Sequence, residues 1–264
     1  MKKYIFKPLF QKSQLSPLQW LQGWSYLLSL ALLLETNTIV QAKTPPKEQP
    51  RSTASVEIAQ SISESGLPAL DYALQGLRLY GEGNYRQAVE ALTQALELES
   101  NPNNRTNFYF LRGRAYYKLQ EYQNALSDLN NAVEGDMEPE NLVIAYFYRA
   151  SSYTELEQYD RAIAALNPLI KSNLDAETRA IAYRNRGRIY GELEQYQQAF
   201  SDYNKAIDLN PNYADPYYRR GLIYQEFDEI SEAQSDFEQA AQLYQQQGDR
   251  EGYQKAMEAI ENLR

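Results

Sequence analysis

The sequence predicts an all-α protein in which five similar helical hairpins follow one another and one further helix closes the array. The first observation is a repeat, because a small residue in a similar setting recurs at spacings of 37, 37, 37 and 34 residues. The second is that large and small residues within each unit follow helical spacing. Self-similarity at such a period is the sequence signature of repeat architectures. The recurring small residues are Gly76, Gly113, Ala150, Gly187 and Gly221.

Within each unit, the pattern predicts two antiparallel helices. With the recurring small residue as position 8, large residues, mostly tyrosines, fall at positions 4, 11, 17 and 24, and a second small residue falls at position 20. Positions 4, 8 and 11 share one helix face, as do positions 17, 20 and 24. Pairing 11 with 17, 8 with 20 and 4 with 24 gives one constant sum, as two helices folding back near position 14 require. In the second unit, Gly113 and Ala125 would then let the two backbones approach closely.

These residues and their spacing resemble the tetratricopeptide repeat (TPR) family. The resemblance implies a right-handed α-solenoid whose concave face holds peptides or partner proteins, and it implies no catalytic residue within the repeat. A C-terminal helix within residues 248–264 looks like the cap that ends such arrays. The five units are residues 69–102, 106–139, 143–176, 180–213 and 214–247.

The third unit departs most from the family pattern. It has Ala150 in place of glycine, and Pro168 falls inside its second helix. Because proline lacks an amide donor, we expect Pro168 to kink or shorten that helix. Three-residue additions precede units two, three and four and are expected to lengthen the connections; they are residues 103–105, 140–142 and 177–179.

The first 42 residues differ from the repeats and are typical of a secretory signal peptide. Four lysines precede an apolar run at 24–34, and Val40, Gln41 and Ala42 then form a site that a signal peptidase reads. We therefore expect export to the periplasm, a lumen or the extracellular space. The alternative is an uncleaved membrane anchor, although a spanning helix needs roughly 20 apolar residues and this run is shorter.

Residues 43–68 differ again, because they are rich in proline, serine and charged residues. Such a segment cannot bury enough apolar surface to offset the entropy lost on ordering, so the sequence predicts a flexible linker. A short helix at 56–62 is the alternative for part of it.

The composition excludes several kinds of chemistry. The chain has no histidine and no cysteine, so it lacks the usual catalytic triads, zinc, haem and iron–sulfur ligands, and disulfides. Removing residues 1–42 leaves 22 basic and 34 acidic residues, and such a charge argues against nucleic acid as a partner. We expect no catalytic residue, no metal and no cofactor. The rival, an enzyme that uses only carboxylates and tyrosines, would work in an open groove that excludes water poorly.

Position 7 carries an arginine in four units. Asp128, Asp202 and Asp236 occupy position 23 of units two, four and five, at nearly the same height on the facing helix. This arrangement predicts internal Arg–Asp bridges that fix the register of the two helices. The third unit has Ala165 at that position, which leaves its arginine without the expected carboxylate. The four arginines are Arg112, Arg149, Arg186 and Arg220.

The family resemblance implies that the first helix of each unit lines the groove with positions 2, 5, 9 and 12. There, aromatic residues stand beside arginines, a combination that suits an extended peptide or a helix with acidic groups. The competing interpretation is that these aromatic residues are core and these arginines are solvated or paired with glutamates. With Arg149 added as an unpaired cation, the candidate groove residues are Asn107, Phe110, Arg114, Tyr117, Phe147, Arg149, Arg184, Arg188 and Tyr218.

The sequence therefore predicts a non-catalytic, exported scaffold that binds an acidic peptide or protein and assists the assembly of a complex. The alternative is a structural repeat protein that associates with itself and has no groove ligand. Contact with a membrane is expected only through residues 1–42, if they are not cleaved. The oligomeric state is left open.

Overall fold

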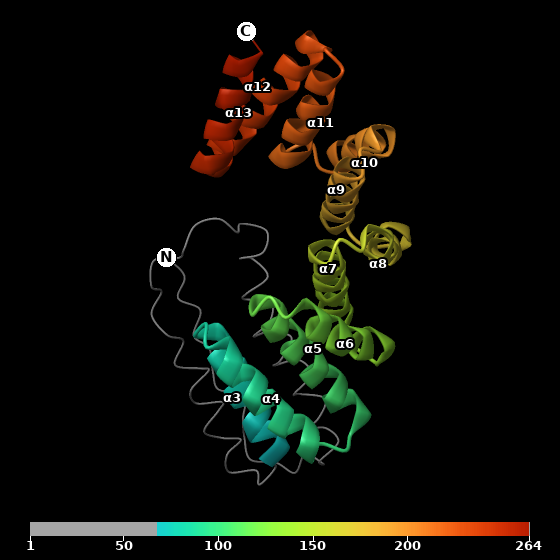
Figure 1. Cartoon of the computed structure of the whole chain (residues 1–264), viewed down its shortest axis with the longest axis vertical. Helices are drawn as coiled ribbons and strands as arrows, with labels where there is room; N and C mark the ends of the chain where they lie inside the picture. Colours follow the sequence, from blue (N-terminus) through green and yellow to red (C-terminus); the bar gives the residue numbers. More distant parts are fainter. Residues whose placement is uncertain (1–67, 264) are drawn as a thin grey trace, which may run out of the picture. The chain divides into compact units, whose positions relative to one another are not determined.

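The computed structural model describes residues 68–263, which form eleven α-helices and no β-strand (Figure 1). Each first helix pairs with the helix that follows it. The pairs are α3 (Pro68–Gly81) with α4 (Tyr85–Leu98), α5 (Pro102–Lys118) with α6 (Tyr122–Glu134), α7 (Pro139–Glu155) with α8 (Tyr159–Lys171), α9 (Ala176–Glu192) with α10 (Tyr196–Leu209), and α11 (Ala214–Glu226) with α12 (Ile230–Gln247). The last helix, α13 (Arg250–Asn262), packs on α12. The predicted signal peptide, the linker up to residue 67 and the helix at 56–62 lie outside the described residues.

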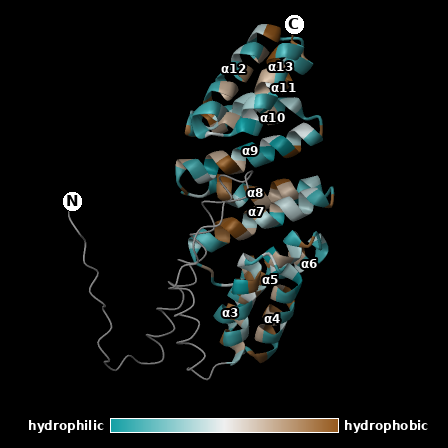
Figure 2. Ribbon diagram, turned by 90° about the vertical axis from the view of Figure 1, so that its left-hand side faces the viewer, coloured by the Kyte–Doolittle hydropathy of each residue, from teal (hydrophilic) through white to brown (hydrophobic). Residues whose placement is uncertain are grey.

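Each hairpin packs on the hairpins that precede and follow it in the chain. The second helix of each hairpin packs on the first helix of the next, as α4 does on α5 and α10 does on α11. First helices also touch one another, as α5 does α7 and α9 does α11. The all-α solenoid predicted from the repeat is therefore confirmed for the described residues. Polar and apolar residues alternate along its helices (Figure 2), and no helix within 68–263 is long and apolar enough to cross a membrane.

Small residues hold the two helices of a hairpin close together. A Cβ placed on Gly113 would lie 2.9 Å from the Leu129 Cγ and 3.3 Å from the carbonyl oxygen of Ala125. A Cβ on Gly187 would lie 2.8 Å from the Tyr203 Cε1. The predicted close approach of positions 8 and 20 is thus present, and the large residue at position 24 packs directly over the glycine.

The turn between the two helices has the same geometry in every unit. Its position 15 adopts a left-handed backbone, with φ of 62° at Gln120 and 80° at Gly83. The Gln120 amide donates to the Tyr117 carbonyl at 2.9 Å, and the Glu121 amide donates to the Tyr116 carbonyl at 2.9 Å. This pair of bonds is the Schellman motif, which satisfies the last carbonyls of a helix and reverses the chain. The fold-back expected near position 14 is therefore built by the backbone.

The three-residue additions do not lengthen the connections, so that prediction is wrong. They form the first turns of α5, α7 and α9, which have 17 residues each, whereas α3 has 14 and α11 has 13. Pro102 and Pro139 open two of these helices, where a missing amide costs nothing. The side chains of Asn101 and Asp175 cap α5 and α9 by accepting hydrogen bonds from backbone amides.

Pro168 does not shorten α8, which was one of its two expected effects. The helix continues to Lys171 and has 13 residues, as α6 does. The proline deprives only the Ala164 carbonyl of its donor, and Ala164 is exposed, so water can take the place of that amide. The Pro168 carbonyl still accepts a hydrogen bond from the Ser172 amide at 3.1 Å. A proline this close to the end of a helix is tolerated because few bonds remain to be broken.

The end of the array is closed by α13. Ala259 and Ile260 on this helix pack against Ala233 and Phe237 of α12. Its other face is polar and exposed, as at Glu258. A terminal helix with one apolar and one polar face covers the last hairpin and ends the stacking. This matches the role expected of a capping helix.

Replacing Gly113 with alanine tests the clearance between the two helices of a hairpin. The added Cβ must displace Leu129 or the α6 backbone, so we expect the free energy of unfolding to fall by about 1–3 kcal/mol. The matched control is Gly191→Ala, where a Cβ meets nothing closer than 4.0 Å. There the better helix propensity of alanine should raise the unfolding free energy, by up to about 1 kcal/mol. Urea denaturation followed by circular dichroism measures both, and a similar change in the two variants would contradict the packing.

Candidate partner-binding surface

The arginines at position 7 form the predicted bridges in three units. Each Nε lies 2.7–2.8 Å from an Oδ2 of the aspartate on the second helix, and each Nη2 donates to the other carboxylate oxygen. Each Nη1 donates to a side chain of the preceding second helix, at Thr93, Asn167 or Asn204. The bridges therefore tie three helices together. The pairs are Arg112–Asp128, Arg186–Asp202 and Arg220–Asp236.

Arg149 occupies the same row without a carboxylate. Its Nε is buried and has no hydrogen-bond partner within residues 68–263, and its guanidinium lies 5.6 Å from the Tyr146 ring centroid. Ala165, which replaces the aspartate, is fully buried. Position 7 points about 200° away from position 5 on a helix, which is across the helix from the groove positions. Arg149 thus belongs to the row of bridges, which corrects its placement in the groove.

Two of the predicted groove residues, Phe110 and Arg114, are buried and lie next to each other. Phe110 is fully buried and Arg114 is only 3% exposed. The Arg114 guanidinium lies 4.7 Å from the Tyr80 ring centroid, 5.4 Å from that of Phe110 and 5.6 Å from that of Tyr148. Three rings around one cation give cation–π stabilisation away from water. In this structure, the core interpretation describes Phe110 and Arg114 better than the groove interpretation does.

Asn107 and the remaining aromatic candidates are half-buried. The Tyr117 ring contacts that of Tyr148 edge-on, with 5.1 Å between centroids, and burial raises the pKa of Tyr117. Phe147 packs on the core between α7, α8 and α9, and the Tyr218 ring lies 5.7 Å from that of Phe237. Each aromatic side chain thus has one side in the core and part of its surface exposed. The Asn107 amide donates to the Asn103 carbonyl at 3.3 Å.

Arg184 is held in a polar network between α9 and α11. Its Nε donates to the Tyr213 hydroxyl at 2.6 Å and lies 3.3 Å from an Oδ2 of Asp215. The Arg219 Nε donates to the same Oδ2 at 2.7 Å. Burial alone would raise the pKa of Asp215, but Arg184 and Arg219 outweigh it and lower that pKa below its usual value. One carboxylate therefore fixes two guanidinium groups, and Arg184 has its partners within the protein.

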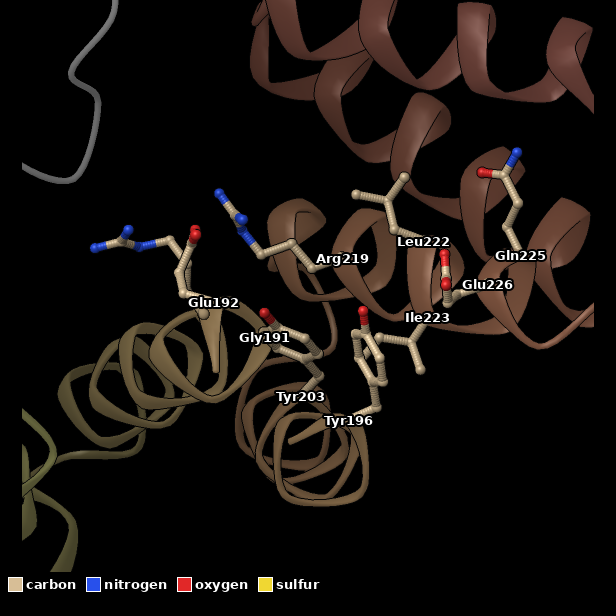
Figure 3. A pocket seen from close by; sticks show the side chains of 10 residues that line it. Gly191, Glu192, Tyr196, Tyr203, Arg219, Leu222, Ile223, Gln225 and Glu226 are labelled. Carbon is tan, nitrogen blue, oxygen red and sulfur yellow. The ribbon is translucent and has the colours of Figure 1, made fainter. Parts of the chain in front are cut away.

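Arg188 lines a pocket formed by α9, α10 and α11 (Figure 3). The cavity has a volume of about 350 Å³, within the usual range of ligand pockets. Within residues 68–263, Arg188 forms no hydrogen bond or ion pair. The pocket joins arginines to tyrosine rings and aliphatic side chains. Its lining residues are Arg188, Gly191, Glu192, Tyr196, Tyr203, Arg219, Leu222, Ile223, Gln225 and Glu226.

The sequence reasoning missed most of this pocket. Gly191 and Leu222 stand at groove positions 12 and 9, but neither carries a charge or a ring that would single it out. Arg219 stands at position 6, which the helical pattern does not assign to the groove. A usable signal is the glycine at position 12, where the first two units have Tyr80 and Tyr117.

The described residues hold no cluster that suggests metal chemistry. Within 68–263, no group of three or more carboxylates, histidines or cysteines lies close enough together to hold a metal ion. The pocket contains guanidinium and phenol groups, which donate hydrogen bonds. These donors suit an anionic group, and the two glutamates of the lining are too few to form a metal cluster of this kind.

Comparison with sequence families identifies the repeat. Models described as "TPR repeat" or "Tetratricopeptide repeat" match residues 74–139, 144–173, 187–226 and 214–247. The chain belongs to the tetratricopeptide repeat family, whose fold and interaction role make it a protein-interaction scaffold. No curated protein matches the sequence.

Several solved structures share the fold. MamA (residue 41 to the end) from Desulfovibrio magneticus RS-1 is 22% identical, with 69% of this chain and 98% of that chain covered and a TM-score of 0.59. YrrB, described as a TPR protein with an unusual peptide-binding site, is 19% identical, with 76% and 96% covered and a TM-score of 0.57. The apo form of RapI is 18% identical, with 78% and 67% covered and a TM-score of 0.67.

The role of the Arg–Asp bridges can be tested by removing one bridge and by adding the one that the third unit lacks. Asp202→Ala leaves Arg186 without its carboxylate, so we expect the unfolding free energy to fall by about 1–3 kcal/mol. Ala165→Asp offers Arg149 the missing carboxylate and should raise the unfolding free energy, by up to about 1.5 kcal/mol. Chemical denaturation at low and high salt measures both variants. A change of only a few tenths of a kcal/mol in Asp202→Ala would contradict a structural role for the bridges.

Proposed function

We propose that this protein is a non-catalytic scaffold that holds an acidic peptide or protein segment on its first-helix face, outside the cytoplasm, and assists the assembly of a complex. The first-helix face is the side of α3, α5, α7, α9 and α11 that carries positions 5, 9 and 12. The observation that carries this proposal is the pocket at Arg188, where a guanidinium that forms no hydrogen bond or ion pair within residues 68–263 lies beside the exposed side chain of Leu222. Arginine binds carboxylates in two-pronged geometry, so an acidic group is its natural partner.

The fold supports binding over catalysis. Stacked hairpins present an extended surface that can follow a peptide or a helix. YrrB, which shares the fold, is described as having a peptide-binding site. The half-buried rings of Phe147 and Tyr218 offer further apolar area on the same face. The sequence signals at residues 1–42 support placing this activity outside the cytoplasm.

Charge reversal at Arg188 tests the partner-binding role. We expect Arg188→Glu to lose an acidic partner, because the guanidinium that binds it becomes a carboxylate that repels it. Arg161→Glu is the matched control, since Arg161 is exposed on α8, a second helix. Affinity capture from the extracytoplasmic fraction of the source cells, with quantitative mass spectrometry, compares the two variants with the wild type. Identical captured proteins for Arg188→Glu and the wild type would contradict the proposal, and recovery of the chain alone would favour self-association.

Export can be tested separately from binding. We expect the full chain, produced in a bacterial host, to appear in the periplasm or medium with its N-terminus at Lys43, because the cleavage signal ends at Ala42. Cell fractionation and intact-mass measurement give the location and the cleavage site. An uncut chain in the membrane fraction would support the anchor, and an uncut chain in the cytoplasm would contradict export.

A further inference from the structure

Gly191 is a helical glycine that packing does not require. A Cβ on Gly191 would meet only the Tyr203 hydroxyl, at 4.0 Å, whereas a Cβ on Gly187 in the same helix would clash at 2.8 Å. Gly191 is the second-to-last residue of α9, and the turn does not require a glycine there, because its left-handed residue is Glu194. Neither close approach nor the turn therefore accounts for the residue. Its effect on the structure is to leave space on the first-helix face.

Another junction of the array shows how side chains can fill that space. Between units two and three, Tyr117 at position 12 stacks edge-on against Tyr148 at position 6 of the next unit, with 5.1 Å between ring centroids. The equivalent residues between units four and five are Gly191 and Arg219, and both line the pocket. One junction is thus filled by two rings, and the other is open and lined by a guanidinium.

The guanidinium of Arg219 is oriented from within the protein. Its Nε donates to Asp215 at 2.7 Å, and Arg184 holds the same carboxylate from α9 at 3.3 Å. The two Nη atoms of Arg219 form no hydrogen bond within residues 68–263. Asp215 thus positions Arg219 and leaves its outer donors available to a ligand. Arg188 lines the same pocket from α9 and forms no hydrogen bond within residues 68–263, although its charge also acts on Asp215. Two guanidinium groups therefore border the pocket, and each can bind a carboxylate.

The rest of the pocket is suited to an apolar side chain. Leu222 is 39% exposed, and Tyr196 and Ile223, which lie next to one another in Figure 3, line the same pocket. Gln225 and Glu226 lie on the side away from Arg219 (Figure 3), and Glu192 is also at the rim. Both glutamates are exposed, and they disfavour a second carboxylate in the ligand because like charges repel.

We propose that this opening, defined by Gly191, Arg188 and Arg219, is a specificity pocket for a single acidic side chain that is followed by an apolar side chain in an extended segment of the partner protein. This inference rests on the proposed function and narrows it to one residue pair of the ligand. Arg188 and Arg219 bind the carboxylate, and Leu222 and Tyr196 contact the apolar group. An acidic tract does not fit, since the glutamates at the rim oppose it.

The test uses defined peptides and the full chain as exported. The probes are acetyl-Ser-Glu-Leu-Ser-amide, its Gln-for-Glu isostere and a tetraglutamate peptide, each titrated into ¹⁵N-labelled protein up to the millimolar range. We expect the first peptide to shift the amide signals of Gly191 and Leu222, and the other two to bind at least about tenfold more weakly. Arg219→Gln should lose the preference for glutamate over glutamine.

Gly191→Tyr is the decisive variant, because it fills the pocket as the tyrosine does in unit two and leaves every charge in place. We expect it to lose peptide binding, while Arg161→Glu, on the exposed surface of α8 outside the pocket, keeps the affinity within about twofold. Thermal unfolding of each variant shows that the fold is retained.

Two results would overturn the specificity pocket. One is equal binding of the glutamate and glutamine peptides, or no shift of the Gly191 and Leu222 amides by any peptide. The other is unchanged binding by a folded Gly191→Tyr variant. If the pocket fails in this way while Arg188→Glu still loses captured partner proteins, the scaffold function stands without it. If Arg188→Glu also captures the same proteins as the wild type, both proposals fail.

Discussion

The whole array depends on a steric constraint inside the hairpins, where the two helices pass so closely that only a small residue fits at the anchor, a glycine in four units and Ala150 in the third. At Gly113 and Gly187, the side chain from position 24 occupies the space that a Cβ would need. A hairpin covers only part of its apolar surface internally, so the rest is buried on the neighbouring units. Because each neighbour is placed by the same close contact, the clearance at the anchor sets the geometry of every junction between units. A small error at one anchor would therefore shift the surface on which the next hairpin packs.

The first helix of each unit has two sides with different roles, the side of position 7 and the first-helix face. On the position 7 side, arginine bridges join a hairpin to the preceding second helix, and they require a carboxylate at position 23; the third unit lacks it and leaves the Nε of Arg149 without a partner. On the first-helix face, the constraint is weaker, and the residues vary. There, units one to three enclose Arg114 among rings, whereas units four and five leave a cavity at Gly191. The residues of the first-helix face thus differ between the two ends of the array, whereas three of the five units keep the bridge on the opposite side.

Local pattern predicted the helices and their pairing because the information lies within a few turns of chain. The spacing around Gly113 and Ala125 specifies one hairpin without reference to any other. Whether a side chain at a groove position is exposed depends on the residues of the neighbouring unit. The pattern within one unit contains no information about them. Phe110 and Arg114 were assigned to the groove by position, and they are buried against Tyr80 and Tyr148 from the units on either side. The additions at 103–105 are predicted to lengthen a connection because they lie between two repeat units, but Asn101 caps α5 before them and they extend that helix.

The net negative charge of a chain with 35 acidic and 26 basic residues opposes an acidic partner, but this overall charge and the local charge of the pocket act over different distances. Interactions between exposed charges are largely screened beyond about 8–10 Å at physiological salt, so the net charge acts on the rate of approach. Within the pocket, Arg188 and Arg219 act at contact distance, where screening is weak and the pairing is directional. The overall negative charge weakens the binding of acidic partners that have no specific contact. It has less effect on a partner whose carboxylate enters the pocket. Selectivity in this arrangement comes from position, because a carboxylate gains attraction only where Gly191 lets it reach both guanidinium groups.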